Sequence, residues 1–174
     1  MAIQEEDLKL IHMNEVEATA IDWLWYTYIP YGKITVIQGD PGDGKTTVVL
    51  AIAAAVTTGA ALPESKSTTE PMTVIFQTAE DDLSDTVKPR LVQTGADCGR
   101  VIVIDESEKE LSLSDLRIER AITLTGAKLF ILDPLQAYLG ADVDMHRANE
   151  IRPVLKRIGA IAEQMLNTYG KPHR

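Results

Sequence analysis

The sequence has very little cysteine and no long apolar run. Its single cysteine, Cys98, cannot form an internal disulfide, and we interpret it as a bystander thiol. The three histidines, His12, His146 and His173, are scattered and give no metal-ligand spacing. No apolar run approaches the ~20 residues that span a bilayer. Residues 1–7 are acidic where a signal peptide would be basic, so we expect a cytoplasmic protein without membrane contact.

Basic side chains are also few. Seventeen Lys and Arg against 26 Asp and Glu give a formal net charge of −9, which disfavours nonspecific binding of nucleic acid by this chain alone. The densest basic cluster, either a binding patch or a solvated helix face, consists of Arg147, Arg152, Lys156 and Arg157. A hydrophobic fraction of 45% over 174 residues is ordinary for one globular domain. We expect a single domain over 1–174, with a lead-in segment over 1–32 and a polar tail over 166–174.

A glycine-rich motif in the first third of the chain is its most informative feature. Residues 39–46 match G-x-x-x-x-G-K-[ST] and read Gly39-Asp40-Pro41-Gly42-Asp43-Gly44-Lys45-Thr46. In such a loop, backbone N–H groups point at an anion and the following helix presents its positive end. Lys45 would reach the β- and γ-phosphates, and the Thr46 hydroxyl would bind Mg²⁺. An ordinary glycine-rich turn is the alternative. We predict that residues 39–47, Thr47 included, bind ATP with Mg²⁺.

The flanking residues and the rest of the chain support an α/β fold. Residues 33–38 are rich in β-branched side chains and predict a buried strand, and residues 47–56 predict an apolar helix. After a loop over 59–71, further strands are expected over 72–77, 101–104 and 128–132. This alternation predicts a mainly parallel sheet sandwiched by helices, with ligands at the carboxyl ends of the strands.

Three helices are expected between and after these strands. The first covers 83–94 and is kinked or restarted at Pro89. The second carries Leu116, Ile118, Ile122 and Leu124 and ends at Gly126, with Ser112 or Ser114 as its N-cap. The third begins near Pro153. Its apolar stripe consists of Val154, Leu155, Ile158, Ile161, Ala162, Met165 and Leu166.

Aromatic residues gather just before the glycine-rich motif of residues 39–46, which is called the P-loop below. They are Trp23, Trp25, Tyr26, Tyr28 and Tyr31. Their side chains either belong to the core and cover the first strand, or form a platform on which the base of a nucleotide stacks. Core packing is favoured, because aromatic side chains bury large apolar areas.

Two carboxylates are candidates for the second half of the site. Asp133 follows the apolar run 129–132, which is the Walker B arrangement of a strand that delivers a carboxylate beside Mg²⁺. A plain strand-ending turn is the alternative. Glu80 follows the strand over 72–77 and would activate the attacking water as catalytic base, alongside Lys45. The neighbouring Asp81 and Asp82 leave open that this acidic cluster only caps the next helix.

The chain resembles the RecA-like ATPases at the P-loop and at two further motifs. These are Phe76-Gln77-Thr78-Ala79-Glu80-Asp81-Asp82 and Leu129-Phe130-Ile131-Leu132-Asp133-Pro134-Leu135-Gln136-Ala137-Tyr138. The most similar members are the AAA-type proteins grouped with RepA-type helicases and RadA-like repair ATPases. The resemblance covers about residues 10–164. It implies that Glu80 activates water, that Asp133 supports Mg²⁺, and that the protein works on DNA as a homo-oligomeric ring or filament.

The end of the sequence departs from this family pattern. In the family, the helix matched by residues 153–165 leads into a further buried strand with a polar sensor residue, followed by an arginine finger. Residues 167–174 are polar instead, so we expect a truncated core whose nucleotide binding is better supported than its turnover. The alternatives are a nucleotide-binding regulatory or interaction fragment and a small-molecule kinase. A GTPase is disfavoured because no Asn/Thr-Lys-x-Asp motif occurs.

Overall fold

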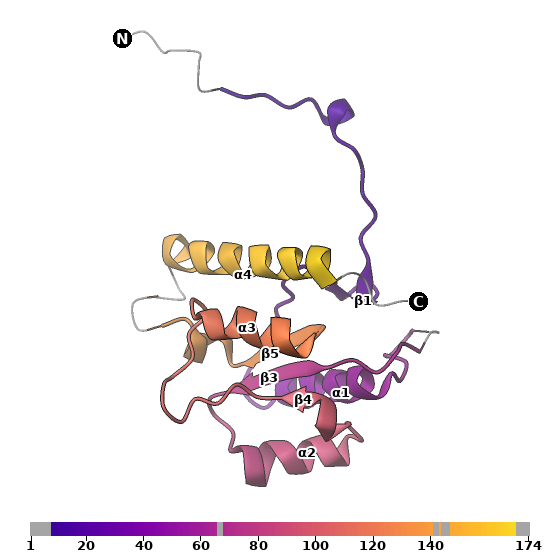
Figure 1. Cartoon of the computed structure of the whole chain (residues 1–174), viewed down its shortest axis with the longest axis vertical. Helices are drawn as coiled ribbons and strands as arrows, with labels where there is room; N and C mark the ends of the chain where they lie inside the picture. Colours follow the sequence, from indigo (N-terminus) through magenta and orange to yellow (C-terminus); the bar gives the residue numbers. More distant parts are fainter. Residues whose placement is uncertain (1–7, 66–67, 141–142, 144–146, 170–174) are drawn as a thin grey trace.

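The computed structural model describes residues 8–65, 68–140, 143 and 147–169. Within these residues a three-stranded sheet lies between helices (Figure 1). The strands are β3 (Val74–Thr78), β4 (Val101–Ile102) and β5 (Leu129–Asp133), in the order β4-β3-β5. β3 pairs in parallel with both neighbours. The predicted α/β fold with a parallel sheet is therefore confirmed, and the strand boundaries differ from the predicted ones by one or two residues.

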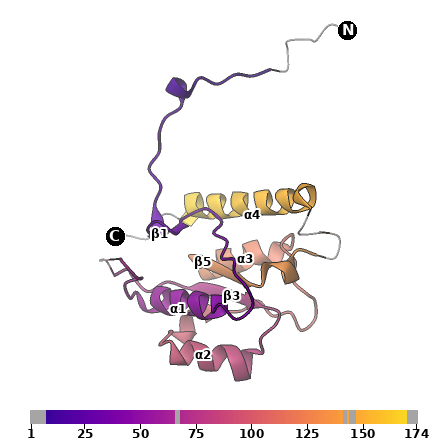
Figure 2. The same ribbon diagram turned by 180° about the vertical axis from the view of Figure 1, so that it is seen from behind.

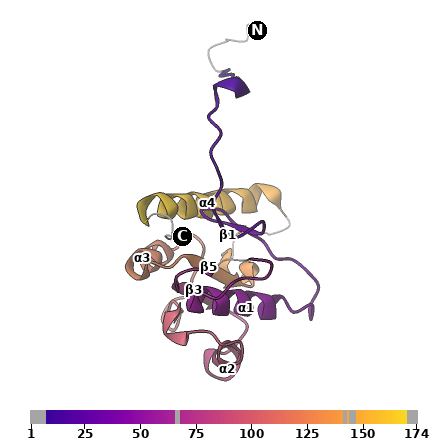
Figure 3. The same cartoon turned by 90° about the vertical axis from the view of Figure 1, so that its right-hand side faces the viewer.

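Helices cover both faces of the sheet. Figure 3 shows α3 and α4 on one side, and α1 and α2 on the other. The helices are α1 (Lys45–Thr58), α2 (Lys88–Gln93), α3 (Leu116–Thr125) and α4 (Ala148–Tyr169). Short helical turns are η2 (Met13–Glu15), η3 (Leu83–Val87), η4 (Cys98–Arg100) and η5 (Leu135–Tyr138). Among the described residues, no helix is long and apolar enough to cross a membrane.

The core is divided by the sheet into two clusters. Leu129 and Ile131 of β5 pack in the cluster that includes residues of α1 and α2. Phe130 and Leu132 pack against the cluster that includes residues of α3, α4 and η5. Successive side chains of a strand point to opposite faces, so one short strand serves both clusters. This position also carries Asp133, the last residue of β5, to the carboxyl edge of the sheet.

The predicted strand over residues 33–38 is wrong. Residues 34–40 have no regular secondary structure and are exposed, and no strand among the described residues pairs with them. Figure 2 shows this segment running from the hairpin near α4 towards α1. A β-branched sequence becomes a strand only when a neighbouring strand pairs with it, and here a cleft of about 590 Å³ separates it from β5.

Two predicted helix starts are also wrong. The N-cap of α3 is Asp115, not Ser112 or Ser114, because its carboxylate accepts the amide of Arg117 at 2.9 Å and a further bond from the Arg117 side chain. The two serine hydroxyls bond each other instead. α4 begins at Ala148, five residues before Pro153. Ile151, Val154 and Ile158 pack on the second core cluster, so tertiary packing extends the helix around the proline.

Other helical predictions agree with the structure in part. η3 gives way to α2 at Lys88, with Pro89 in the first turn, so the restart at this proline is confirmed. α3 ends before Gly126 as predicted, although its Leu124 is 83% exposed. α4 extends to Tyr169, so the first part of the predicted polar tail, residues 166–169, is helical. The rest of that tail, with the side chains of His146, Met165 and His173, lies outside the described residues.

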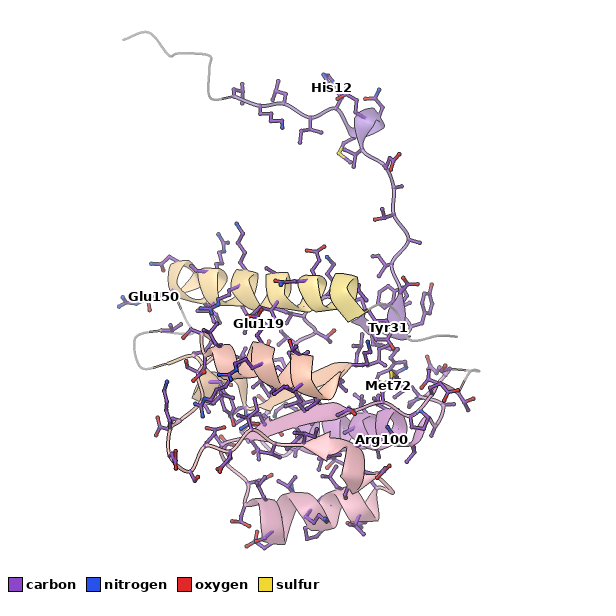
Figure 4. All side chains as sticks on the ribbon, in the orientation of Figure 1. His12, Tyr31, Met72, Arg100, Glu119 and Glu150 are labelled. Atoms are coloured by element: carbon purple, nitrogen blue, oxygen red, sulfur yellow. The ribbon has the colours of Figure 1, made fainter. Side chains whose placement is uncertain are left out.

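The aromatic cluster forms a hairpin that the sequence did not predict. β1 (Trp23–Trp25) pairs antiparallel with β2 (Ile29–Pro30). The Trp25 indole donates to the Pro63 carbonyl at 2.9 Å, and the Tyr31 hydroxyl to Met72 Sδ at 3.8 Å (Figure 4). Burial, and then the nearby Asp22 charge, raise the pKa of Tyr31 to about 12. Trp25 and Tyr31 thus cover the core as favoured, whereas Tyr26 and Tyr28 are exposed.

Candidate nucleotide-binding site

The P-loop residues form a tight turn that leads into α1. Gly42 and Gly44 have φ angles of 90° and 82°, in the left-handed region that favours glycine. A Cβ at either position would meet no atom within 4 Å. Glycine is therefore required here by the backbone conformation, and open space remains beside both residues for a ligand to approach the main chain.

Asp43 holds the first half of this loop. Its carboxylate accepts the amide of Asp40 at 2.7 Å, and the amide of Asp43 returns a bond of 3.2 Å to the Asp40 carbonyl. A Cβ on Gly39 would lie 2.8 Å from the same carboxylate. Asp43 thus sets the shape of the turn, and Gly39 is the residue that leaves room for it.

The helix that follows presents free amides. Gly44 precedes α1 and supplies no side-chain cap, and no acidic residue lies in the first turn. The N–H groups of this turn and the helix dipole together favour an anion. Thr47 lies in the same turn and is exposed. The start of α1 is thus suited to phosphate.

Lys45 lies folded over its own loop. Its ammonium donates to the carbonyls of Gly39 and Asp40, at 3.0 and 2.7 Å. Both bonds keep the positive charge above the turn in which the free amides lie. A phosphate bound there would meet this ammonium without any change of secondary structure.

Thr46 and Asp133 meet between α1 and β5. The Thr46 hydroxyl donates to Asp133 Oδ2 at 2.7 Å, and both side chains are partly buried. A hydroxyl and a carboxylate at the edge of a phosphate loop are ligands that suit Mg²⁺, which keeps several waters and takes few protein oxygens. The described residues contain no group of three or more His, Cys, Asp or Glu side chains that could hold a metal ion by themselves. A Mg²⁺ ion bound together with a nucleotide needs fewer protein ligands, because waters and phosphate oxygens fill its remaining positions. The residues present therefore fit a Mg²⁺-nucleotide.

Glu80 lies at the same edge of the sheet as Asp133. Thr78 is in register with Asp133 across the parallel β3–β5 pair, and Glu80 follows two residues later. Its carboxylate is exposed, and no hydrogen bond or ion pair of this side chain occurs in the described part of the chain. Within the described residues, no hydrogen bond or ion pair joins the Glu80 side chain to Lys45, Thr46 or Asp133.

The two aspartates beside Glu80 have structural partners. Asp82 caps η3 by accepting from the amides of Ser84 and Asp85, and its bonds to Ser84 lower the pKa of this carboxyl. Asp81 pairs with Arg90 at 3.3 Å. The capping interpretation of the acidic cluster therefore applies to Asp82. Glu80 is the member of the cluster that these contacts leave available for chemistry.

A polar network near this edge was missed in the sequence. The Gln77 side chain is buried and bonds both the amide and the carbonyl of Ile104, each at 2.9 Å, as a strand backbone would. It also bonds Glu106, which accepts the Leu111 amide at 3.1 Å. The sequence signal that could have indicated this network is the amide side chain of Gln77, which directly follows the apolar residues 74–76.

Tyr138 lies close to Glu106 of this network. Its hydroxyl is buried and lies near Glu106 without meeting hydrogen-bond geometry to any described residue. Burial, and then the charges of Glu106 and Asp133, raise the pKa of Tyr138 well above its ordinary value. The tyrosine is therefore a neutral, buried support beneath the end of β5.

Comparison with known proteins agrees with this geometry. A family model described as an AAA domain matches residues 3–168, nearly the whole chain. Searches of curated proteins and of solved structures find no match. The glycine turn, the open start of α1, the Thr46–Asp133 contact and the parallel sheet are consistent with the nucleotide-binding core of such a domain. The chain belongs to the AAA domain family of P-loop ATPases.

Proposed function

We propose that this domain binds ATP with Mg²⁺ and hydrolyses it as the RecA-like motor core of a DNA replication, recombination or repair ATPase. The observation that carries the proposal is the 2.7 Å contact of Thr46 with Asp133 beside the P-loop. It joins the two side chains that a Mg²⁺-nucleotide site requires. Family membership supports the ATPase, and the resemblance of the three motifs to RepA-type and RadA-like proteins supports the role on DNA.

Each residue has a role that follows from its chemistry. Lys45 and the amides at the start of α1 bind phosphate oxygens, and Thr46 with Asp133 holds the metal. Bound Mg²⁺ supplies neutralisation of the phosphate charge. Glu80, exposed at the same edge, orients the attacking water and accepts its proton.

The second candidate is a nucleotide-binding module without turnover. Two observations favour it: among the described residues Glu80 makes no hydrogen bond or ion pair with another site residue, and no strand pairs with the segment that leads into the P-loop. Binding requires only the loop and its lysine, whereas hydrolysis also requires a positioned base. Binding and turnover therefore have to be measured separately.

The test is a titration with a fluorescent ATP analogue together with steady-state phosphate release. Lys45→Ala should lose most of the affinity, and Lys88→Ala, which removes an exposed lysine at the start of α2, should keep it. Equal affinities of parent and Lys45→Ala would refute nucleotide binding at this loop. Binding without phosphate release would favour the second candidate.

The proposed partners are DNA and further copies of this chain, in the cytoplasm. Arg152, Lys156 and Arg157 lie exposed on α4, and Arg147 just before it pairs with Glu150 at 3.3 Å. With a net charge of −9, any contact with DNA depends on such a local patch. Phosphate release with and without single-stranded DNA, alongside sedimentation, tests this part. If DNA leaves the rate of phosphate release unchanged and the chain stays monomeric, both proposed partners are refuted and only the nucleotide site remains of the proposal.

A further inference from the structure

The phosphate loop carries more negative than positive side chains. Residues 39–46 contain two carboxylates, Asp40 and Asp43, and one ammonium group, that of Lys45. Both aspartates are exposed. The loop amides, the dipole of α1 and the lysine attract a phosphate, whereas a carboxylate beside it repels it. The attraction of phosphate therefore does not explain why aspartate stands in this loop.

Asp43 braces the empty loop. Its Oδ2 accepts the Asp40 amide at 2.7 Å, and its own amide donates to the Asp40 carbonyl at 3.2 Å. These two bonds close a ring across the turn. The loop also contains three glycines, Gly39, Gly42 and Gly44. Glycine loses more conformational freedom on ordering than any other residue, so a side chain that holds the turn prepares it for a ligand.

The charge of Asp43 is not neutralised by the lysine of the same loop. In the described part of the chain no salt bridge joins the two side chains, because the Lys45 ammonium donates to the carbonyls of Gly39 and Asp40. The Asp40 carbonyl accepts both this ammonium, at 2.7 Å, and the Asp43 amide. One carbonyl thus holds Lys45 and the backbone of Asp43 together. A phosphate that bonds Lys45 here lies close to an unneutralised carboxylate.

We propose that Asp43 sets the nucleotide selectivity of this loop in two opposite ways. Its hydrogen bond to the Asp40 amide prepares the loop for phosphate, and its charge repels phosphate that Mg²⁺ does not neutralise. The inference rests on the proposed function, because it concerns the selectivity of the same site. A metal-free triphosphate is more negative than its Mg²⁺ complex by the full charge of the ion, so the repulsion acts mainly on the metal-free form. Asp43 therefore selects the Mg²⁺ complex without touching the metal.

Asp43→Asn separates the charge from the hydrogen bond. Asparagine keeps an oxygen that accepts the Asp40 amide, and it is neutral. With EDTA present, this variant should bind the fluorescent ATP analogue about fivefold or more tightly than the parent, and with Mg²⁺ the gain should be about twofold. High salt should reduce the gain, because the carboxylate is exposed. Equal affinities of parent and variant for the metal-free analogue would overturn the inference.

Asp43→Ala removes the charge and the hydrogen bond together. It should bind the Mg²⁺ complex of the analogue about 2- to 10-fold more weakly than Asp43→Asn, the usual contribution of a hydrogen bond. In the nucleotide-free protein, hydrogen exchange should show the Asp40 amide protected in the parent and in Asp43→Asn, and unprotected in Asp43→Ala. This measurement does not depend on binding. An alanine variant that binds as tightly as the asparagine variant would overturn the brace.

Asp97→Asn is the matched control. Asp97 is an exposed aspartate that also accepts a backbone amide, that of Gly99 at 2.9 Å, and it lies just before the amino end of β4, away from the phosphate loop. Its replacement should leave both affinities unchanged. A gain equal to that of Asp43→Asn would assign the effect to the net charge of the chain and overturn the inference.

The parent protein keeps the two proposals apart in these titrations. Parent binding of the Mg²⁺ complex without any charge effect at Asp43 overturns the inference and leaves the proposed function intact. Absence of parent binding overturns both.

Discussion

The hydroxyl of Thr46 donates to the carboxylate of Asp133 at 2.7 Å, across 87 positions of the sequence. The contact joins the first turn of α1 to the last residue of β5. Because Thr78 is in register with Asp133, the same edge also carries Glu80. One hydrogen bond therefore marks the place where the three sequence motifs converge.

Thr46→Val and Asp133→Asn should each weaken the Mg²⁺ dependence of nucleotide binding. We expect the affinity for Mg²⁺ in the complex to fall about tenfold or more, since each variant removes an oxygen that holds the ion or its water. The double variant should lose little more than the worse single variant, because both residues act on one ion. Titration of the analogue over a range of Mg²⁺ concentrations measures this. Fully additive losses would place the two side chains at separate sites.

Glu80→Gln should keep nucleotide affinity and lose turnover by about 10²- to 10⁴-fold, the usual contribution of a general base. Glu108→Gln is the matched control, because Glu108 is exposed in the loop after β4. Phosphate release and analogue binding are measured on both variants. Unchanged turnover in Glu80→Gln would show that Glu80 belongs with Asp82 as a structural residue.

Gln77→Leu should lower the free energy of unfolding by about 2 kcal/mol or more. The variant leaves the amide and carbonyl of Ile104 without this partner at a partly buried position, and an unsatisfied buried group costs about 1–3 kcal/mol. Gln93→Leu, at an exposed position of α2, should stay within about 0.5 kcal/mol of the parent. Denaturant unfolding followed by circular dichroism checks both. Equal stabilities would mean that water replaces the Gln77 side chain.

Asp115 should stabilise the fold in a pH-dependent way. Its bonds to Arg117 lower the pKa of this carboxyl from 3.8 to about 2. A lowered pKa in the folded state gives stability that is present above pH 3.8 and is lost as the pH falls towards 2. Asp115→Asn should thus be less stable than the parent at pH 7, by about 1 kcal/mol, because a neutral amide bonds the Arg117 guanidinium more weakly than a carboxylate does. The difference should shrink across that pH window.

Ser114→Ala provides the control for this prediction. Ser114 was a predicted N-cap, but in the structure its hydroxyl bonds the hydroxyl of Ser112. Its removal should cost less than about 0.5 kcal/mol and should show no pH dependence between 2 and 7. A pH-independent effect of Asp115→Asn would indicate that the cap acts through its hydrogen bond to the amide alone.

The nucleotide loop and the α/β alternation were predictable because their chemistry is local. Glycine at positions 42 and 44 permits a left-handed backbone by itself, and the lysine and threonine that follow bring an ammonium group and a hydroxyl at fixed spacing. The apolar run that ends at Asp133 likewise predicts both a buried strand and the edge of the sheet where its carboxylate lies.

Only the tertiary structure decided which segments find partners. Residues 33–38 read as a strand, yet a strand exists only where a second backbone pairs with it, and in this fold the edge of β5 lies across a cleft. The same reason explains Asp115 and Gln77, whose roles depend on the Arg117 side chain and on Ile104, 27 positions from Gln77. Residue type and spacing thus determined the chemistry available to this chain, and its hydrogen-bond partners were set by how the chain folds back on itself.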